Sequence, residues 1–446
     1  MKRTLLTKLL AWKDKSERKP LLIDGARQTG KTYLLQELLG QHFKQVVHID
    51  FLESPDMAQA FAGSLTPEDV FANIELLTGK VFNPNTDLLV LDEIGECSRA
   101  VTSLKYFAEK SSKCFIAGSG SNIGLLDAFP VGKVEQHNLR PLTFHEFLAA
   151  SNEVTLMKAY EDQVNSSAAH TRLFGKLTDY YFTGGMPEAV KTWFELADKS
   201  ILERVEAVTQ IQADLVSGYL RDFGKYSGKV DASLIEAIFR AVPSQLSAVV
   251  DESVKRFKFK QVYQRKSRYQ QLESGITWLE KCRLVLKNYT VEGYPRTPLA
   301  ACKKTNRVKL FLMDIGLLQH MLGVSYQQIK QQGYEYKGYV AENFVQQELV
   351  AAGIDPTYSW NDARAEIEFI ASDQEGNIIP IEVKSGKRTK AKSLRSYIAK
   401  CQPKKTIKLT GTQASSPLEQ KHLVFPLYYT EHVVEKYLKN NPTSKP

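Results

Sequence analysis

Eight residues near the start of the chain have the types and spacing that bind nucleotide phosphates. Gly25-Ala26-Arg27-Gln28-Thr29-Gly30-Lys31-Thr32 follows the P-loop pattern. Its glycines let backbone N–H groups approach phosphate oxygens, and the following helix adds the positive end of its dipole. Lys31 would reach the β- and γ-phosphates, and the Thr32 hydroxyl would bind magnesium. We therefore predict an ATP and Mg²⁺ site with these contacts: Gly25, Ala26, Arg27, Gln28, Thr29, Gly30, Lys31, Thr32 and Tyr33.

An apolar run further along ends in two acids, the pattern of a Walker B strand. In Asp87-Leu88-Leu89-Val90-Leu91-Asp92-Glu93 the strand delivers Asp92 to the metal at its carboxyl end. Glu93 is then placed to orient and deprotonate the attacking water. Solvated acids also end ordinary strands, and it is the preceding P-loop that favours the catalytic interpretation. We predict Glu93 and Lys31 as catalytic residues.

A third strand, 113–119, ends in small polar residues. Ser119 or Ser121 would lie near the γ-phosphate as a sensor, and we place Ser119 among the catalytic residues. The alternative is a plain turn, because Gly118-Ser119-Gly120-Ser121 is also typical loop chemistry.

A second set of acids lies towards the C-terminus. Glu368, on one strand, precedes Glu382-x-Lys384 on the next, and residues two apart share a strand face. This is the spacing of the restriction-endonuclease-like fold, to which Glu342 would add a carboxylate from a helix. Such a cluster can hold a metal and activate water for attack on a phosphodiester, while the lysine stabilises developing charge. The alternative is a plain salt-bridge network on a hairpin.

The elements that position these residues predict an α/β protein in several parts. Residues 1–150 alternate apolar runs with helical patterns, as in a P-loop NTPase core with a parallel sheet. Residues 151–230 predict a helical lid or linker, and 231–325 a winged helix. Residues 326–440 predict the C-terminal restriction-endonuclease-like α/β domain, followed by a tail at 441–446.

Within 231–325 the pattern predicts three helices and a hairpin. The first helix includes 234–239 and ends before Pro243, and the second starts at Gln245. The third spans 269–281 and carries Lys266 and Arg268 at its N-terminal end, where recognition helices meet DNA.

Basic residues are concentrated in two stretches. Residues 253–310 contain 15 Lys or Arg against 3 Asp or Glu, and 384–408 contain 10 against none, although the whole chain carries a net charge of only +9. Segregated charge of this kind predicts a polyanionic partner such as DNA. Solvated lysine-rich faces are the alternative.

Composition indicates which broad class of protein this chain belongs to. Of 446 residues, 43% are hydrophobic and 24% charged, as in ordinary globular proteins. The five cysteines lack metal-ligand or redox spacing, which predicts a reducing compartment. No apolar run has the length of a membrane span, and the first residues pattern as an amphipathic helix. We expect a cytoplasmic protein without a membrane partner.

Several stretches, which together cover nearly the whole chain, carry a resemblance to a known family. They are the P-loop, Leu91-Asp92-Glu93-Ile94, Gly118-Ser119, Arg140-Pro141-Leu142-Thr143-Phe144-His145-Glu146-Phe147, Tyr181-Phe182-Thr183-Gly184-Gly185-Met186-Pro187-Glu188, Asp222-Phe223-Gly224-Lys225-Tyr226 and Lys309-Leu310-Phe311-Leu312-Met313-Asp314-Ile315-Gly316-Leu317-Leu318. With these stretches the chain resembles a large prokaryotic family of AAA+-related P-loop ATPases with a C-terminal domain of unknown function. The resemblance implies ATP binding and hydrolysis and an AAA-type core. AAA-type relatives often assemble, so a homo-oligomer is an open alternative to a monomer.

The chain departs from this family's pattern at two positions. Gly95 stands where the family often has Gln, and Lys133 stands where many members have Arg. If an arginine finger belonged at 133, this chain lacks it, and Arg140 and Arg99 are the remaining candidates. Surface ion pairing is the commoner role of an arginine.

The sequence thus predicts a Mg²⁺-dependent ATPase that acts as a motor or switch on DNA or on a protein partner. Two alternatives stay open. One is a metal-dependent nuclease regulated by its ATPase part, and the other is a nucleotide-switched interaction protein with slow turnover.

Overall fold

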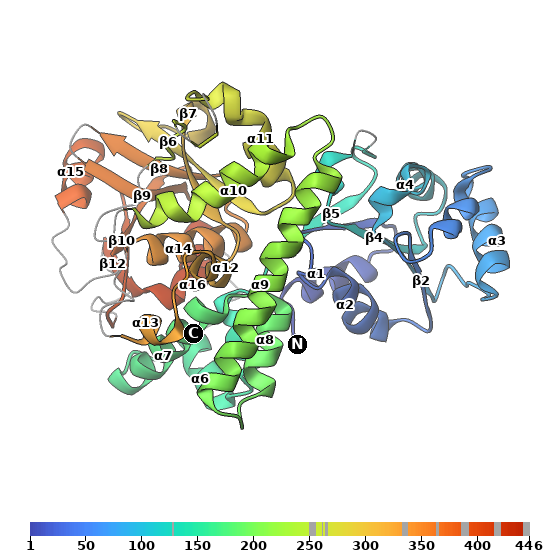
Figure 1. Ribbon diagram of the computed structural model, residues 1–446, viewed down its shortest axis with the longest axis horizontal. Helices are drawn as coiled ribbons and strands as arrows, with labels where there is room; N and C mark the ends of the chain where they lie inside the picture. The colour runs from blue at the N-terminus through green and yellow to red at the C-terminus, as the bar shows by residue number, and fades with distance from the viewer. Residues whose placement is uncertain are drawn as a thin grey trace. The chain divides into compact units, whose positions relative to one another are not determined.

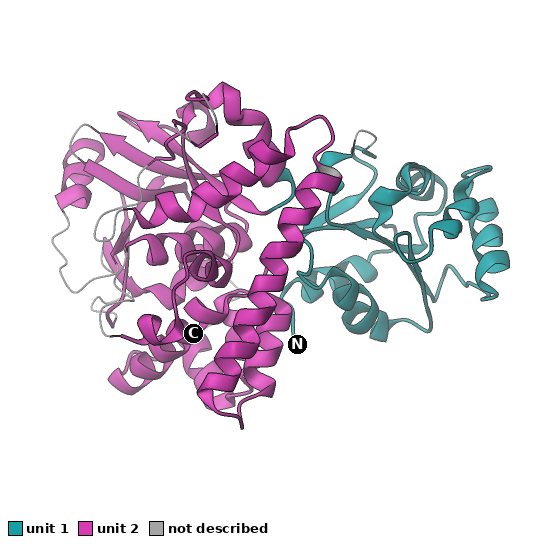
Figure 2. Cartoon of the chain, in the orientation of Figure 1, with its two compact units in different colours: residues 1–140, 281–283 teal, residues 141–280, 284–446 magenta. Residues whose placement is uncertain are grey.

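The computed structural model divides into two compact units (Figure 2). Unit 1 contains Met1–Arg140 and the distant segment Lys281–Arg283, and unit 2 contains Pro141–Glu280 and Leu284–Pro446. The structure describes residues 1–126, 129–248, 256–260, 262–263, 266–331, 338–362, 365–384, 392–413 and 421–439. The tail predicted at 441–446 lies outside these residues.

Unit 1 is built on a five-stranded parallel sheet in the order β2-β3-β4-β1-β5 (Figure 1). The first strand in sequence is therefore flanked by later ones, and the loop after β1 lies beside the end of β4. This confirms the predicted α/β core with a parallel sheet. The strands are β1 (Leu21–Asp24), β2 (Val46–Asp50), β3 (Leu88–Asp92), β4 (Phe115–Gly120) and β5 (Glu135–Asn138).

Alternate strand residues enter two hydrophobic cores, one on each face of this sheet. Leu21 and Ile23 pack in a core with α1 and the helix after the P-loop. Leu22, between them, packs in another core with α3 and α4. Successive side chains of a strand point to opposite faces, so helices cover both sides of the sheet. The helices are α1 (Leu5–Lys13), α2 (Lys31–Tyr33) continued by a π-helical segment (Leu34–Leu39), α3 (Pro67–Thr78) and α4 (Ser98–Lys110).

Unit 2 begins with helices, as predicted for 151–230. The predicted capping box at Thr143 and Glu146 is confirmed: the Thr143 side chain accepts from the Glu146 N–H, and the Glu146 carboxylate accepts from the Thr143 N–H. The helices are α5 (Phe144–Ala150), α6 (Val154–Glu161), α7 (Ser167–Thr183), α8 (Pro187–Glu195) and α9 (Ile201–Tyr226).

Two glycines between α7 and α8 hold two distant parts of unit 2 together. A Cβ on Gly185 would overlap the backbone of Leu142, and one on Gly184 would overlap the carboxylate of Asp314. The Asp314 carboxylate accepts hydrogen bonds from the N–H groups of Gly185 at 2.6 Å and Leu317 at 2.9 Å. Only glycine allows this approach.

The first two helices predicted for the winged helix are one helix, α10 (Ala232–Ser247), and the prediction of a break before Pro243 was wrong. The reason is packing: Val242, Pro243 and Leu246 are all buried, so the helix gains apolar contacts by continuing past the proline. The third helix, α11 (Tyr269–Lys281), has the predicted bounds. Lys266 and Arg268 precede it.

The hairpin of the predicted winged helix belongs to a larger sheet. Its strands β6 and β7 pair antiparallel, and β6 also pairs in parallel with β8. The result is a seven-stranded mixed sheet in the order β12-β11-β10-β9-β8-β6-β7. The winged helix thus does not stand as a separate module. The strands are β6 (Val285–Glu292), β7 (Lys303–Leu312), β8 (Thr357–Asp362), β9 (Ala365–Ser372), β10 (Ile378–Lys384), β11 (Thr406–Thr410) and β12 (His422–Pro426).

The C-terminal part has one helix before three antiparallel strands and another helix before a parallel strand. This is the order α14-β8-β9-β10-α15-β11, in which β10 and β11 are parallel. The remaining helices are α12 (Ile315–Met321), α13 (Tyr326–Lys330), α14 (Gly338–Ala351), α15 (Lys392–Cys401) and α16 (Thr430–Val433), the last continued by a π-helical segment (Val434–Leu438). Within the described residues, no helix is both long and apolar enough to cross a bilayer.

Candidate functional site: a P-loop nucleotide site

The predicted P-loop joins a buried strand to a helix, as its chemistry requires. Strand β1 ends at Asp24, and α2 begins at Lys31. A Cβ on Gly25 would overlap the carbonyl oxygen of Leu139, so no larger residue fits there. Gly30 has φ 88°, a left-handed conformation that favours glycine. Both motif glycines are therefore required by the backbone.

Lys31 lies buried inside the loop that it follows. Its Nζ donates hydrogen bonds to the carbonyl oxygens of Gly25 and Ala26, each at 3.0 Å. Burial lowers the pKa of Lys31, and the negative charges of Glu93, Asp92 and Asp24 act in the opposite direction. The amine is thus held at the loop in a field of three carboxylates.

Asp92 connects the P-loop to the predicted sensor strand. Its Oδ2 accepts a hydrogen bond from Thr32 Oγ1 at 2.5 Å, and its Oδ1 accepts one from Ser119 Oγ. Burial alone would raise the pKa of Asp92, but hydrogen bonds from His48, Ser119 and Thr32 lower it to about 2. The carboxylate is therefore ionised at neutral pH, and the structure brings Thr32, Asp92 and Ser119 together.

Glu93 follows Asp92 in an unusual backbone conformation, with φ 46°. A non-glycine residue seldom adopts this conformation, and such positions concentrate at functional sites. Its Oε2 accepts the N–H of Ser121 at 3.4 Å. Burial raises the pKa of Glu93, while the charge of Lys31 acts against this shift. A carboxylate with a raised pKa is a stronger base than a solvated one.

The sequence patterns did not predict three residues of this site. His48, on β2, places Nε2 3.5 Å from Asp92 Oδ2. Arg3 is buried and donates from Nη1 to the carbonyl oxygen of Thr29 at 2.8 Å. Arg283 places Nε 2.9 Å and Nη2 2.8 Å from Asp24 Oδ2. Only His48 had a signal, because its strand neighbours the Walker B strand in P-loop sheets.

The Arg283 segment also contacts the loop after the sensor strand. Cys282 Sγ lies 3.7 Å from Asn122 Oδ1, and a Cβ on Gly124 would approach the carbonyl oxygen of Lys281 too closely. Lys281 and Cys282 thus contact the loop after β4. Arg283 contacts Asp24, the residue that precedes the P-loop.

Of the two arginine-finger candidates, Arg99 binds backbone carbonyls of unit 1 through its side chain. Arg99 donates to the carbonyl oxygens of Phe61 and Gly63, both at 2.5 Å, and the Arg140 carbonyl accepts from Arg3 at 2.5 Å. Lys133 pairs with Glu109 at 2.8 Å. The identity of an arginine finger stays a prediction.

Tyr33, predicted as a nucleotide contact, accepts a hydrogen bond through its hydroxyl from the N-terminal amine at 2.9 Å.

The predicted C-terminal cluster also assembles, on β9 and β10 of unit 2. Glu368 accepts from Lys384 Nζ at 2.9 Å and from the Val383 N–H at 3.0 Å. Lys384 Nζ lies 3.8 Å from Glu382 Oε1. Burial raises the pKa of Glu382, Lys384 lowers it, and the charge of Glu368 raises it further. Sequence spacing therefore placed these three side chains correctly.

Glu342 belongs to a neighbouring ion-pair network. Lys309, which is fully buried, places Nζ 2.5 Å from Glu366 Oε1 and 3.4 Å from Glu342 Oε2. Within the part of the chain that the structure describes, no three His, Cys, Asp or Glu side chains are arranged to hold a metal. The glutamates of this region contact lysines, and the choice between a metal site and a salt-bridge network stays a prediction.

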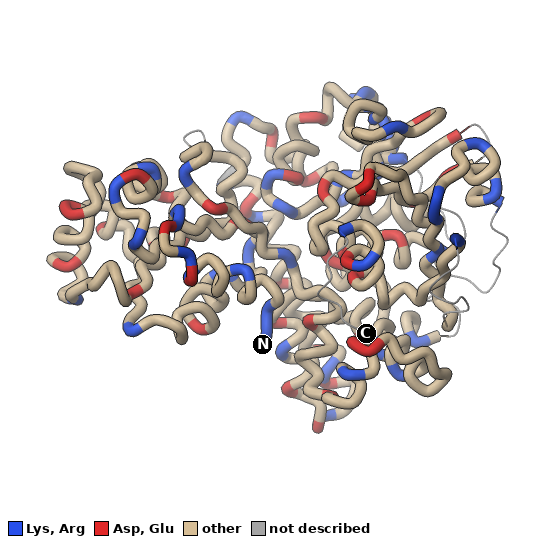
Figure 3. The backbone as a smooth tube through the Cα atoms, turned by 180° about the vertical axis from the view of Figure 1, so that it is seen from behind, with Lys and Arg blue, Asp and Glu red and all other residues tan. Residues whose placement is uncertain are grey.

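The two basic stretches are only partly described. Of 384–408, the structure describes Lys384 and 392–408, which include α15 and the start of β11. Lysine and arginine positions lie interspersed with acidic ones over much of the described chain (Figure 3). Charge alone therefore does not single out one face as a DNA site.

Fold and site together define a P-loop nucleotide-binding protein, and comparison with known families agrees. Residues 17–148, which lie in unit 1 up to Arg140 and continue into unit 2, match an AAA domain, and this match indicates an AAA-related P-loop ATPase. Residues 175–328 and 337–430 match two domains of unknown function, DUF8612 and DUF4143. No curated protein matches the chain. Among solved structures, C. elegans PCH-2 aligns over 46% of this chain and 67% of its own, at 14% identity and a TM-score of 0.31.

Proposed function

We propose that the protein hydrolyses ATP with Mg²⁺ in unit 1. The observation that carries this proposal is the hydrogen-bonded set Thr32–Asp92–Ser119, which joins P-loop, Walker B strand and sensor strand at one point. A hydroxyl and an ionised carboxylate in contact are the oxygen ligands that Mg²⁺ prefers. Thr32 and Asp92 would hold the ion, which supplies positive charge at the phosphate oxygens.

The other residues have separate roles in this proposal. The loop N–H groups and the α2 N-terminus bind the phosphates, and Lys31 moves from the loop carbonyls to the β- and γ-phosphates. Glu93 orients the attacking water and accepts its proton, which its raised pKa favours. Ser119 holds Asp92 in place and reports the γ-phosphate to β4.

The test is ATP turnover in the full chain. Lys31→Ala should abolish hydrolysis, while Lys80→Ala, which removes an exposed lysine from the same unit, should leave it unchanged. Unchanged turnover in Lys31→Ala would refute the proposal.

We propose further that the ATPase acts as a motor or switch on DNA or a protein partner, and as a homo-oligomer. Turnover with and without DNA separates a DNA-stimulated motor from a slow nucleotide-switched interaction protein.

A metal-dependent nuclease is the second candidate. The assembly of Glu368, Glu382 and Lys384 on neighbouring strands favours it. Because each glutamate lies beside a lysine, a metal would have to displace that lysine. Incubation of DNA with Mg²⁺ and either the wild type or Glu382→Ala tests this function. Cleavage that disappears in the variant supports it, and absence of cleavage in the wild type excludes it.

A further inference from the structure

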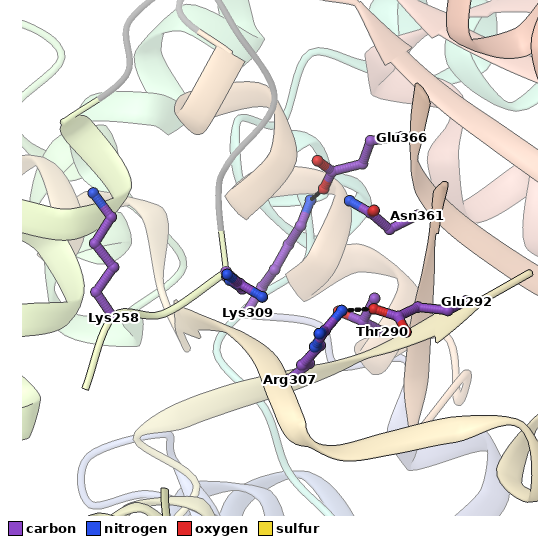
Figure 4. Close-up of a pocket in the computed structure, with 8 residues that line it drawn as sticks. Lys258, Thr290, Glu292, Arg307, Lys309, Asn361 and Glu366 are labelled. Atoms are coloured by element: carbon purple, nitrogen blue, oxygen red, sulfur yellow. Dashed lines mark ion pairs between the residues drawn. The ribbon is translucent and has the colours of Figure 1, made fainter. Parts of the chain in front are cut away.

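Unit 2 contains a polar cavity of about 480 Å³ (Figure 4). Its residues come from four strands that are neighbours in the sheet, in the order β9-β8-β6-β7, and from the segment that precedes α11. Glu292, Asn361 and Glu366 lie in one row across three of these strands, because Asn361 is the register partner of both glutamates. This row forms one wall of the cavity.

Both glutamates of the cavity are already paired with cations of β7. Arg307 forms an ion pair with Glu292, and Lys309 pairs with Glu366 (Figure 4). Burial lowers the pKa of Lys309, but the charges of Glu342 and Glu366 outweigh this and raise it, so Lys309 remains a cation. Glu292 and Glu366 are therefore each paired with a cation, and Lys309 is shared with Glu342, which does not line the cavity.

Two further cations of the cavity lie on the segment that precedes α11. Arg256 and Lys258 are exposed and flank Phe257, which is buried. Within the described residues, no carboxylate is paired with either cation. The two cations are thus exposed, while the residue between them faces the core. Among the residues that line the cavity, four cations thus face two carboxylates.

The backbone of this segment is fixed. The N–H of Phe257 donates to the carbonyl oxygen of Val308 at 2.8 Å. Gln245 clamps Lys258 twice: its Oε1 accepts from the Lys258 N–H at 2.7 Å, and its Nε2 donates to the Lys258 carbonyl at 2.9 Å. The two cations thus start from a backbone segment that is hydrogen-bonded to β7 and to a side chain of α10.

Cations with amide and hydroxyl donors suit a phosphate group. Arginine and lysine bind phosphate oxygens, and Asn361 and Thr290 provide further donors. Basic side chains also continue outside the cavity along β7, the last strand of the sheet, where Lys304 is exposed. A single small anion needs no such continuation, whereas a chain of phosphates does.

We propose that this cavity binds a phosphate of a nucleic-acid backbone. The proposal names the partner class for the function proposed above and in that sense rests on it, but the binding itself requires no ATP hydrolysis. Contact with the backbone does not depend on base sequence, so we expect strong dependence on salt.

The test is fluorescence anisotropy of a labelled single-stranded oligonucleotide with the full chain. The double variant Arg256→Ala/Lys258→Ala should bind about tenfold more weakly, and its salt slope should fall by about two. The control is Lys191→Ala/Lys199→Ala, which removes the same charge from exposed positions at α8 and the following turn. Equal weakening in both double variants would show that net charge, and not the cavity, supplies the affinity, and would overturn the proposal.

Two further experiments distinguish a nucleic-acid phosphate from a free phosphate compound, and oligonucleotide binding from ATP hydrolysis. If inorganic phosphate stabilises the wild type but not Arg256→Ala/Lys258→Ala, and the oligonucleotide does not bind, the ligand is a free phosphate compound and the nucleic-acid assignment is wrong. Lys31→Ala should bind the oligonucleotide as the wild type does, even though it no longer hydrolyses ATP. Loss of oligonucleotide binding in Lys31→Ala would indicate that the oligonucleotide binds in unit 1, and would overturn the proposal.

Discussion

Asp24 and Arg283 form an ion pair although 259 residues separate them in the chain. Asp24 is fully buried at the end of β1, directly before the P-loop, and both contacts from Arg283 go to its Oδ2. A buried carboxylate without a cation is costly, so this pair stabilises the strand that carries the loop.

Removal of Arg283 should destabilise unit 1. We expect Arg283→Ala to lower the free energy of unfolding by about 3 kcal/mol, because the Asp24 charge stays buried without its guanidinium. Chemical denaturation measures this. Asp24→Asn/Arg283→Ala should recover part of the loss, since the buried charge is then gone. Strictly additive losses in this cycle would show that the two residues do not interact.

Loss of the Thr32 hydroxyl should slow hydrolysis more than it lowers stability. A hydrogen bond to a charged group contributes about 1.5–3 kcal/mol, which corresponds to roughly 10- to 150-fold in turnover. Thr32→Ala should show this decrease, and Thr32→Ser should retain most of the activity. Steady-state ATPase assays over a range of Mg²⁺ concentrations measure both variants, and equal activity of Thr32→Ala and wild type would remove Thr32 from the metal site.

Protonation of Asp92 should weaken the fold at low pH. Its pKa in the folded protein is lowered to about 2, below its value in an unfolded chain. The stabilisation is therefore complete above the unfolded value of about 4 and is lost as pH falls towards 2, with a total of about 2 kcal/mol. Wild type and Asp92→Asn should thus differ less in unfolding free energy at pH 3 than at pH 7. A constant difference would contradict the shift.

A methyl group at Gly25 should disrupt the loop. Gly25→Ala would force a Cβ against the Leu139 carbonyl, and overpacking of this kind costs about 1–3 kcal/mol. We expect ATP affinity to fall together with stability. Gly63→Ala is the matched control, because no atom lies within 4 Å of its added Cβ. Calorimetric titration with ATP and thermal unfolding separate the two effects. Normal ATP binding by Gly25→Ala would be inconsistent with the close approach.

The site could be predicted from the sequence where one short stretch of residues determines both the local structure and the chemistry. The P-loop and the pair Asp92–Glu93 each combine a buried strand with polar residues at its carboxyl end, so the pattern itself carries the geometry. Spacing of two along a strand likewise placed Glu382 and Lys384 together. The bounds of α11 followed from its apolar periodicity.

Other features depend on contacts that no local pattern encodes. Arg3 and Arg283 reach the P-loop region from the N-terminus and from beyond residue 280, and nothing near either residue indicates its partner. The pairing of β6 with β8 crosses α12, α13 and α14, so the hairpin alone looked like a separate module. Pro243 stays inside α10 because of tertiary packing, which overrides the intrinsic preference of proline.

The presence of Lys281–Arg283 in unit 1 has a consequence for how the chain acquires its structure during synthesis. A ribosome makes the P-loop, the Walker B strand and β5 long before residue 283 leaves it. Until then, the Asp24 carboxylate lacks the arginine that neutralises it. Unit 1 therefore reaches its final stability only after residue 283 has been translated, and a fragment that ends at residue 140 would lack this stabilisation.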